Sequence, residues 1–281
     1  MSTISAATDL GARRTADSGQ QIIVFDDVAI GFEGKNVLDG VSFALTRGET
    51  KILFGVAGVG KSTLLKLVLG LEKPDRGHIW VLGQDVTAMR EQDLFELRRK
   101  IGMVFQESAL FDSLTVQENV GYRLYEERLG EEEIRRRAQE ALRFVELGHT
   151  LDMFPSELSG GMRRRVAIAR AIITQPEVLL YDSPTGGLDP ITSTRIIELV
   201  VKQRDFYKTS ALLVTHRLQD GFTMATHYFD PQKNEMRPLA ENPGADVNTT
   251  FVLLREGKVI FNGTAEEMGA SQDEYIKEYI A

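Results

Sequence analysis

The chain has 281 residues, with 33 basic and 41 acidic side chains and no cysteine. This length supports one or two domains with a sizeable buried core, and 42 % hydrophobic residues is an ordinary globular value. The lack of Cys excludes disulfides, thiolate metal sites and cysteine nucleophiles. The formal charge of −8 argues against broad nucleic-acid binding, because contact with many phosphates requires a basic surface.

The first elements follow a polar N-terminal stretch. Residues 1–20 are small and polar without an apolar run, which indicates a disordered tail and no ordinary secretory signal. No apolar run reaches the roughly 18 residues of a membrane span, so we expect a chain that is soluble by itself. From Gln21 the pattern predicts short strands in residues 21–49 and 51–54, then a helix over 61–69 that ends at Gly70.

The remaining elements alternate between helices and apolar strands. Residues 114–145 are expected to be helical and highly charged, with one narrow apolar stripe. Residues 176–181 and 211–215 are short apolar runs, typical of interior strands of a parallel sheet covered on both faces, and residues 101–105 are strand-like. Residues 230–249 are polar and contain three prolines, which predicts a loop insertion between two strands. The pattern as a whole is α/β with a helical insert.

A glycine-rich segment carries the clearest chemistry. Residues 55–62 (GVAGVGKS) fit G-x-x-x-x-G-K-[ST] between an apolar strand and a helix, as a phosphate loop requires. Glycines let backbone N–H groups surround phosphates, and the helix N-terminus favours the same anion. An ordinary glycine-rich turn is the alternative for this segment taken alone. We expect nucleotide contacts from Gly55, Val56, Ala57, Gly58, Val59, Gly60, Lys61, Ser62 and Thr63.

Further motifs follow in an order that resembles the ATP-binding-cassette (ABC) ATPases over about residues 21–265. Residues 158–162 (LSGGM) resemble the signature motif, although the family usually has Gln where Met162 stands. Residues 178–182 (VLLYD) resemble the Walker B strand, and Leu188-Asp189 the D-loop. Further positions that match the family are Gln106 of the Q-loop, the switch histidine His216 and the adenine-stacking aromatic Phe32.

Each of these residues also has a purely structural alternative. Asp182 could cap a strand end, His216 could be an ordinary structural histidine, and Phe32 could be a core aromatic. Four arginines follow the signature on the predicted helix, and for them we expect a solvated helix face: Arg163, Arg164, Arg165 and Arg170.

The resemblance implies a fold and a set of roles. The fold is a P-loop NTPase of the ABC type, with a RecA-like parallel core sheet, an antiparallel β subdomain and an α-helical subdomain at about 107–175. The chain then divides into the tail 1–20, the ATPase domain 21–265 and a C-terminal helix 266–281. Mg²⁺ would be held through Ser62, Gln106 and Asp182.

The family uses two chains for each pair of sites. This chain has one phosphate loop and one signature, so the resemblance implies a head-to-tail dimer with two enclosed ATP molecules, formed with a second copy or a relative. The signature residues Ser159, Gly160, Gly161 and Met162 would face ATP held by the partner. In a single chain the same residues open a helix whose free N–H groups favour an anion.

One position departs from the family. After Asp182 the family has Glu, the residue that polarises the attacking water, and this chain has Ser183. A hydroxyl does not accept a proton near neutral pH, and losing a positioned base costs about 10²–10⁴-fold in rate. Three hypotheses follow: slow hydrolysis with His216 and backbone groups positioning water, a nucleotide-gated clamp that turns over negligibly or only beside a competent partner, or an engineered substitution that traps ATP. The catalytic positions of the family would then be Ser183, His216 and Gln106.

The remaining expectations concern partners. A single cassette without coiled coils or zinc inserts resembles a transporter ATPase with a separate membrane permease, held at the cytoplasmic face of the cell membrane. Residues 109–122 (ALFDSLTVQENVGY), LSGGM and GLDPIT at 187–192 resemble the ATPase of Mla-type phospholipid systems, which work with MCE-domain proteins. Amino-acid importers and non-transport clamps remain alternatives. Phe111 and Leu114 would dock the permease or pack in the core, and the C-terminal helix would dock a partner or close the fold.

Overall fold

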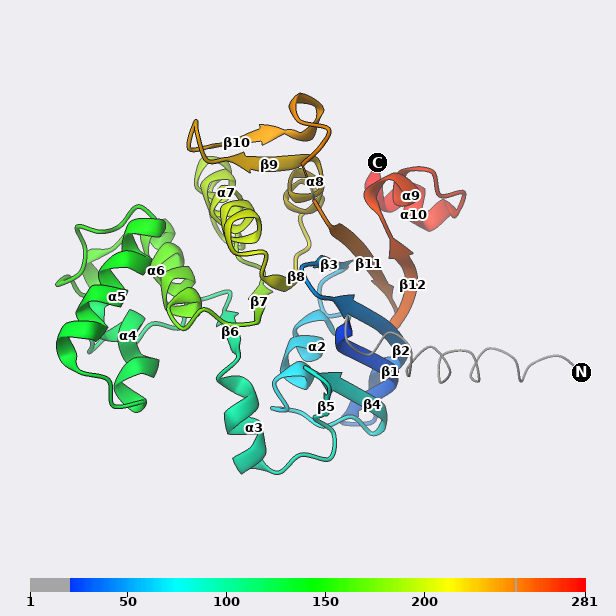
Figure 1. Ribbon diagram of the computed structural model, residues 1–281. Coiled ribbons are helices and arrows are strands. Elements are labelled where there is room, and N and C mark those ends of the chain that lie inside the picture. The colour runs from blue at the N-terminus through cyan, green and yellow to red at the C-terminus, as the bar shows by residue number, and fades with distance from the viewer. Residues whose placement is uncertain (1–20, 246) are drawn as a thin grey trace, which may run out of the picture.

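The computed structural model describes residues 21–245 and 247–281, so the predicted tail of residues 1–20 lies outside the described residues. The chain builds a central sheet, an antiparallel sheet beside it and a helical part that projects to one side (Figure 1). No helix in the described ranges is long and apolar enough to cross a bilayer.

The central sheet has six strands, of which five are parallel. Its edge strand β12 pairs antiparallel with β11, while the pairs from β11 to β6 are all parallel. In spatial order the strands are β12 (Lys258–Gly263), β11 (Thr249–Arg255), β3 (Thr50–Gly55), β8 (Ser210–Val214), β7 (Val178–Asp182) and β6 (Ile101–Val104). The interior strands predicted from apolar runs are therefore confirmed.

Alternate residues of the central strands enter two separate cores. On β3, Ile52 and Phe54 pack with the helices of one face, whereas Leu53 packs with the antiparallel sheet and α2 (Lys61–Val68) on the other. All six residues of β3 are buried. This is why strands covered on both faces show unbroken hydrophobic runs in the sequence.

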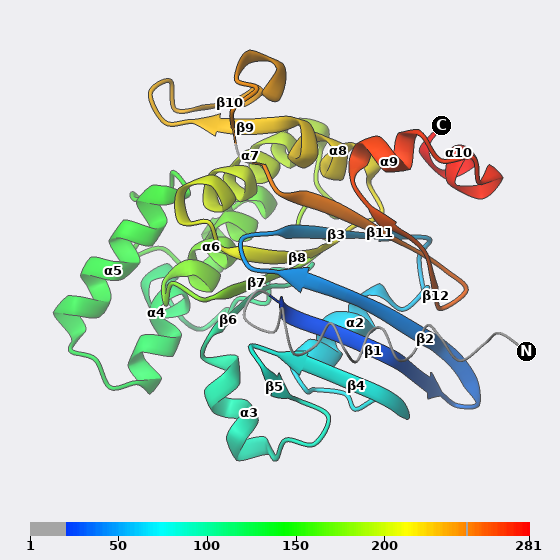
Figure 2. The ribbon, with the colours of Figure 1, turned by 45° about the vertical axis from the view of Figure 1, so that its right-hand side comes forward.

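The antiparallel sheet covers α2 from outside. Its order is β2-β1-β4-β5, and α2 contacts both β4 and the central strands, so the helix lies between the two sheets (Figure 2). The short helix α3 (Glu91–Arg98) connects this layer to β6. The strands are β1 (Gln21–Phe32), β2 (Lys35–Thr46), β4 (Arg76–Val81) and β5 (Gln84–Asp85).

The helical part consists of α4 (Val116–Glu126), α5 (Glu131–Phe144), the 3₁₀ turn η1 (Pro155–Glu157) and α6 (Gly160–Ile172). Thr115 caps α4 with a capping box to Glu118, which fixes the point where the helix begins. The apolar stripe expected on α5 is confirmed, because Ile134, Ala138 and Leu142 are fully buried. The predicted bounds of this subdomain, 107–175, remain a prediction.

The C-terminal third differs from the prediction in two places. Residues 230–249 are not a loop throughout, because β10 (Glu235–Pro238) pairs with β9 (His227–Asp230) and the turn η2 (Leu239–Glu241) follows. Met236 packs on the core and its N–H donates to Glu198, which holds this hairpin against α7 (Pro190–Tyr207). α8 (Leu218–Thr226) precedes the hairpin (Figure 1).

The predicted single helix at 266–281 is instead two short helices. Thr264 caps α9 (Ala265–Gly269) and Asp273 caps α10 (Glu274–Ile280), so each helix has its own N-terminal signal. The two helices lie beside β11 and β12 (Figures 1 and 2).

Candidate nucleotide-binding site

The phosphate loop connects β3 to α2 and depends on glycine at its two ends. Gly55 has φ 151° and Gly60 has φ 101°, conformations that side chains rarely adopt. A Cβ at Gly60 would lie 2.7 Å from Leu38 Cδ2, and one at Gly55 would lie 2.8 Å from the Leu254 carbonyl oxygen. The loop thus turns tightly against β2 and β11, while Val56 at its crest is 54 % exposed.

Lys61 lies buried beneath the loop. Its Nζ donates to the carbonyl oxygens of Gly55 at 2.8 Å and Val56 at 2.9 Å. Burial lowers the pKa of Lys61, and the nearby charge of Asp182 opposes that effect. The ammonium is therefore held inside the loop by groups that phosphate oxygens can replace.

Ser62 and Asp182 meet beside the loop. Ser62 Oγ donates to Asp182 Oδ1 at 3.1 Å. Because β3, β8 and β7 are parallel neighbours, the carboxyl ends of β3 and β7 lie at the same edge of the sheet. A hydroxyl beside a carboxylate is a donor set that suits Mg²⁺, so these residues fit the metal implied by the resemblance. In the described ranges no cluster of three or more His, Cys, Asp or Glu offers another metal site.

Ser183 begins the turn that follows β7. It is 7 % exposed and has φ 46°, and its N–H donates to Val214 O at 2.8 Å. Gly186 lies against both Ser183 and Gln106, because a Cβ there would lie 3.4 Å from Ser183 Cβ and 3.4 Å from Gln106 Cγ. Gln106 and Ser183 therefore lie on either side of the same glycine, in the place where the resemblance expects a glutamine and a glutamate.

The sequence prediction that the arginines after the signature form a solvated helix face is wrong for Arg164 and Arg170. Arg164 is 5 % exposed and its guanidinium donates to the carbonyls of Ser183 at 3.0 Å and Gly186 at 3.3 Å. Arg170 donates to Ser108 O and Ala109 O in the segment after Gln106. Burial lowers the pKa of both guanidiniums, so the backbone carbonyls act as their partners. Helical periodicity does not reveal these bonds, because the acceptors are backbone atoms of distant loops.

His216 is exposed after β8 and lies near a buried carboxylate. Asp220 is 4 % exposed, accepts a hydrogen bond from Thr185 Oγ1 and pairs with Arg217 at 3.6 Å. Burial raises the pKa of Asp220, while Thr185, Arg217 and His216 oppose that rise. Sequence reasoning missed this group, for which the only signal was an acid four residues after the histidine.

The signature residues lie at the start of α6. Ser159 is the N-cap and its Oγ accepts from Met162 N at 3.3 Å, while Gly160 is exposed. A Cβ at Gly161 would lie 2.5 Å from Thr192 Cγ2, so α6 and α7 approach closely there. Asp189 caps α7 by accepting from Thr192 N, and the hydrogen bonds from Thr192 lower the pKa of that carboxyl.

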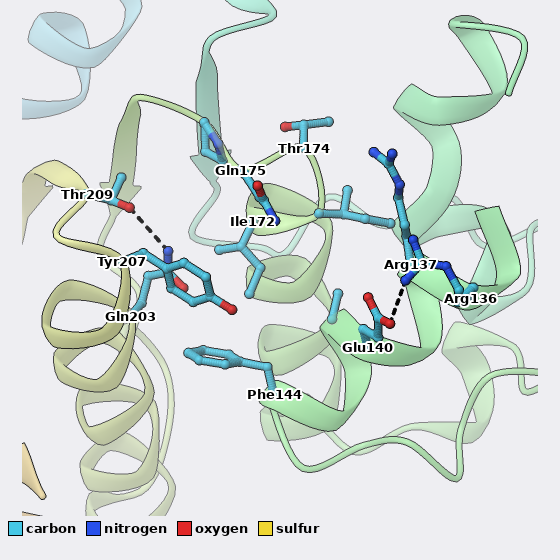
Figure 3. A pocket seen from close by; sticks show the side chains of 13 residues that line it. Arg136, Arg137, Glu140, Phe144, Ile172, Thr174, Gln175, Gln203, Tyr207 and Thr209 are labelled. Carbon is cyan, nitrogen blue, oxygen red and sulfur yellow. Dashed lines mark hydrogen bonds and ion pairs between the residues drawn. The ribbon is translucent and has the colours of Figure 1, made fainter. Parts of the chain in front are cut away.

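The other predicted contacts differ in their exposure. Phe32 ends β1 and is 42 % exposed, so its ring is not a core aromatic. Val59 is buried, Thr63 is half-buried, and Ala57 and Gly58 are exposed. A cavity of about 540 Å³ lies elsewhere, among Arg137, Phe144 and Tyr207 of α5 and α7 (Figure 3). The phosphate loop does not line that cavity.

Comparison with known proteins decides the family. Residues 38–186 match the ABC transporter family. The chain belongs to the ABC transporter family. As an ABC ATP-binding subunit it has the P-loop NTPase fold expected from the motifs, with a mixed central sheet, an antiparallel sheet and helices.

Three known proteins illustrate what this ABC subunit is similar to, in identity and in coverage. A methionine import ATP-binding protein of Bifidobacterium longum is 40 % identical over 70 % of the chain and 51 % of its own length. The chloroplastic trigalactosyldiacylglycerol 3 protein of Arabidopsis thaliana is 36 % identical over 90 % of the chain and 71 % of its own length. The chain thus spans about half the length of the methionine import protein.

The third relative is a solved structure. The ATP-binding cassette MJ0796, described as a dimer in a post-hydrolysis state bound to ADP and Pi, has a TM-score of 0.71 and 28 % identity. It covers 86 % of this ABC subunit and 98 % of its own chain. The ABC ATPase family uses ATP, which agrees with the predicted nucleotide site.

Proposed function

We propose that this ABC subunit binds Mg-ATP at residues 55–63 and drives a separate integral membrane permease from the cytoplasmic face of the membrane. The observation that carries the proposal is the meeting of Lys61, Ser62 and Asp182 at one edge of the central sheet. Lys61 would neutralise phosphate oxygens, and its two carbonyl partners would be replaced by them. Mg²⁺, when bound, would offset phosphate charge, with Ser62, Asp182 and Gln106 as the residues that hold it.

A dimer with two enclosed nucleotides completes the proposal. Val56 and Gly58 at the crest of the loop are exposed, as are Ser159 and Gly160 at the start of α6. An exposed N-cap serine followed by two glycines offers free donors to an anion on another molecule. The likeness to dimeric MJ0796 supports a second copy of this chain, or a related subunit, as the partner.

Slow hydrolysis is the proposed consequence of Ser183. The buried serine replaces a carboxylate with a hydroxyl, and its carbonyl is already tied to Arg164 and Gly186. Gln106 and the exposed His216 remain to orient water, so we propose turnover reduced by about 10²–10⁴-fold relative to a glutamate variant. The two alternatives, a non-transport clamp and an engineered trap, predict that a permease does not increase the rate of ATP hydrolysis.

The cargo belongs to the permease, and the relatives favour one class. Methionine import proteins from several bacteria match 66–78 % of the chain at 37–40 % identity, which supports import of an amino acid or similar small solute. These relatives favour that alternative over the phospholipid prediction.

A lipid is the second candidate for the cargo, and one observation supports it. The trigalactosyldiacylglycerol 3 protein, whose name contains that of a glycolipid, aligns with 90 % of the chain, more than the methionine import proteins do. The predicted MCE-domain partner belongs to this candidate and has no other support.

The permease would dock after Gln106. Phe111 is 45 % exposed and its ring packs at a tilt of 31° against Tyr122, with ring centroids 4.8 Å apart. The fully buried Asn119 fixes this segment, since it accepts from Phe111 N and donates to Phe111 O and Leu114 O. A rigid loop that presents an aromatic pair suits a docking surface better than core packing does.

The function is tested with the purified chain and its permease. Mg-ATP binding is measured by calorimetry for the wild type and for Lys61→Ala, and phosphate release is measured with and without the co-purified permease in lipid. We expect binding that Lys61→Ala abolishes and release that the permease stimulates. Lack of stimulation by any permease that co-purifies would contradict transport and favour the clamp. Loading with a radiolabelled amino acid or phospholipid then separates the two cargo candidates.

A further inference from the structure

The C-terminal helix α10 contacts the phosphate loop directly. The hydroxyl of Tyr279 accepts a hydrogen bond of 3.0 Å from the N–H of Gly55, the first residue of the loop. The two residues are 224 positions apart in the chain, so the contact depends on α10 returning to the carboxyl end of β3. Burial raises the pKa of Tyr279, while the bond from Gly55 opposes that rise.

Both backbone polar groups of Gly55 form hydrogen bonds. Its N–H donates to Tyr279, and its carbonyl oxygen accepts from Lys61 Nζ at 2.8 Å. When phosphate oxygens replace the carbonyl partners of Lys61, the bond to Tyr279 would continue to fix Gly55, together with its strand pairing to Leu254. The close approach of Leu254 to Gly55 leaves the glycine little room to move sideways.

The Tyr279 ring is itself fixed by aromatic neighbours. Its centroid lies 6.4 Å from that of the fully buried Phe54, the residue before Gly55. Tyr275, one turn earlier on α10, stacks on Tyr279 at 6.1 Å and lies beneath Arg255 at 4.2 Å. Ile276 of the same helix is 3 % exposed and joins the core. The hydroxyl therefore sits on a rigid support.

We propose that Tyr279 is a positioning residue for nucleotide binding, which holds the first peptide of the phosphate loop so that the remaining N–H groups face the phosphates. The proposal rests on the nucleotide-binding function proposed above and extends it to the C-terminal helix. Tyr279 does not need to touch the nucleotide for this role. Removing the hydroxyl alone would loosen the loop while leaving the ring contacts in place.

The test is Tyr279→Phe in the full chain, with Tyr275→Phe as the matched control on the same helix. Calorimetry gives the Kd for Mg-ATP, and thermal unfolding reports the fold. We expect Tyr279→Phe to raise the Kd about three- to tenfold, as the loss of one neutral hydrogen bond allows. Tyr275→Phe is expected to leave the Kd unchanged.

A second readout separates positioning from a general loss of structure. In glycine-labelled protein, amide hydrogen exchange at Gly55 should accelerate in Tyr279→Phe, while exchange at Gly102 in β6 stays unchanged. If Tyr279→Phe binds Mg-ATP as the wild type does while Lys61→Ala does not bind, the inference is overturned and the nucleotide-binding proposal stands. If the wild type itself binds no nucleotide, both are overturned.

Discussion

The hydroxyl of Ser62 donates a 3.1 Å hydrogen bond to the carboxylate of Asp182, 120 residues further along the chain. Ser62 is the second residue of α2 and Asp182 ends β7, so the bond joins the end of the phosphate loop to the strand that lies two places away in the sheet. Ser62 and Asp182 would hold the proposed Mg²⁺, which would offset phosphate charge at this point.

Asp182→Asn is expected to remove most of the magnesium dependence of ATP binding. The amide still accepts from Ser62, but it lacks the charge that a divalent cation requires. The Kd for ATP is measured with Mg²⁺ and with EDTA for both proteins. The wild type should bind more tightly with Mg²⁺, and the variant should show a difference at least several-fold smaller. Equal magnesium dependence in the two proteins would exclude Asp182 from the metal site.

Ser183→Glu is expected to raise hydrolysis by about 10²–10⁴-fold, the range for a positioned general base. A residue with a Cβ already occupies position 183 at a φ of 46°, so glutamate adds no new backbone strain there. Phosphate release at saturating Mg-ATP is measured for both proteins, with Ser183→Gln as a control of similar size without a basic group. Similar rates in the wild type and Ser183→Glu would show that Ser183 does not limit turnover.

Arg164→Met is expected to lower the free energy of unfolding by about 2–4 kcal/mol, because it removes two hydrogen bonds to buried carbonyls and leaves only the Gly186 N–H on the carbonyl of Ser183. Those carbonyls belong to Ser183 and Gly186, which form the turn after β7. The measurement is urea unfolding at neutral pH. Arg163→Met is the control, since Arg163 is exposed and on the same helix, and it should change the free energy by less than half as much.

Asp220→Asn is expected to give a stability difference that depends on pH. The pKa of Asp220 is raised in the folded protein, so its ionised form costs stability once the pH exceeds the ordinary carboxyl range near 3.8. That cost is absent below the pKa that Asp220 has in the unfolded chain, and it is complete above the pKa that Asp220 has in the folded protein. The asparagine does not ionise. The free energy of unfolding of the variant should therefore increase relative to that of the wild type as pH rises through this window.

The measurement for Asp220 is urea unfolding at pH values from about 4 to 7. Asp205→Asn is less suitable as a control because Asp205 pairs with the buried Arg204. Asp152→Asn is better, since its carboxylate is 76 % exposed in the pair with Arg135. A relative free energy for Asp220→Asn that is flat with pH would contradict the raised pKa.

Local motifs made much of the site predictable. The phosphate loop, the strand ending at Asp182 and the position of His216 after β8 all follow from short apolar runs and adjacent polar residues. These features lie within one segment each, and parallel strands bring their ends together. The roles of Ser183 and Gln106 came from the family resemblance and stay predictions, while the structure shows that both residues lie against Gly186.

The remaining features depend on contacts between distant segments. The pattern of α6 predicted exposed arginines, yet Arg164 and Arg170 reach backbone carbonyls of the loops after Asp182 and Gln106. Backbone acceptors leave no signature in a side-chain sequence. The same reason hid the hydrogen bonds of Asn119 and the contact of Tyr279 with Gly55. The β9–β10 hairpin was missed because its strands are short and polar.

The docked C-terminal helix also gives experimental access to the site. Because the chain has no cysteine, Ala281→Cys would introduce a single thiol, and residue 281 is exposed two positions after Tyr279. A fluorophore attached there would report on the neighbourhood of Gly55 without competing label elsewhere. A label on this helix would therefore allow nucleotide binding to be followed in real time, both in the free subunit and in the complex with its permease.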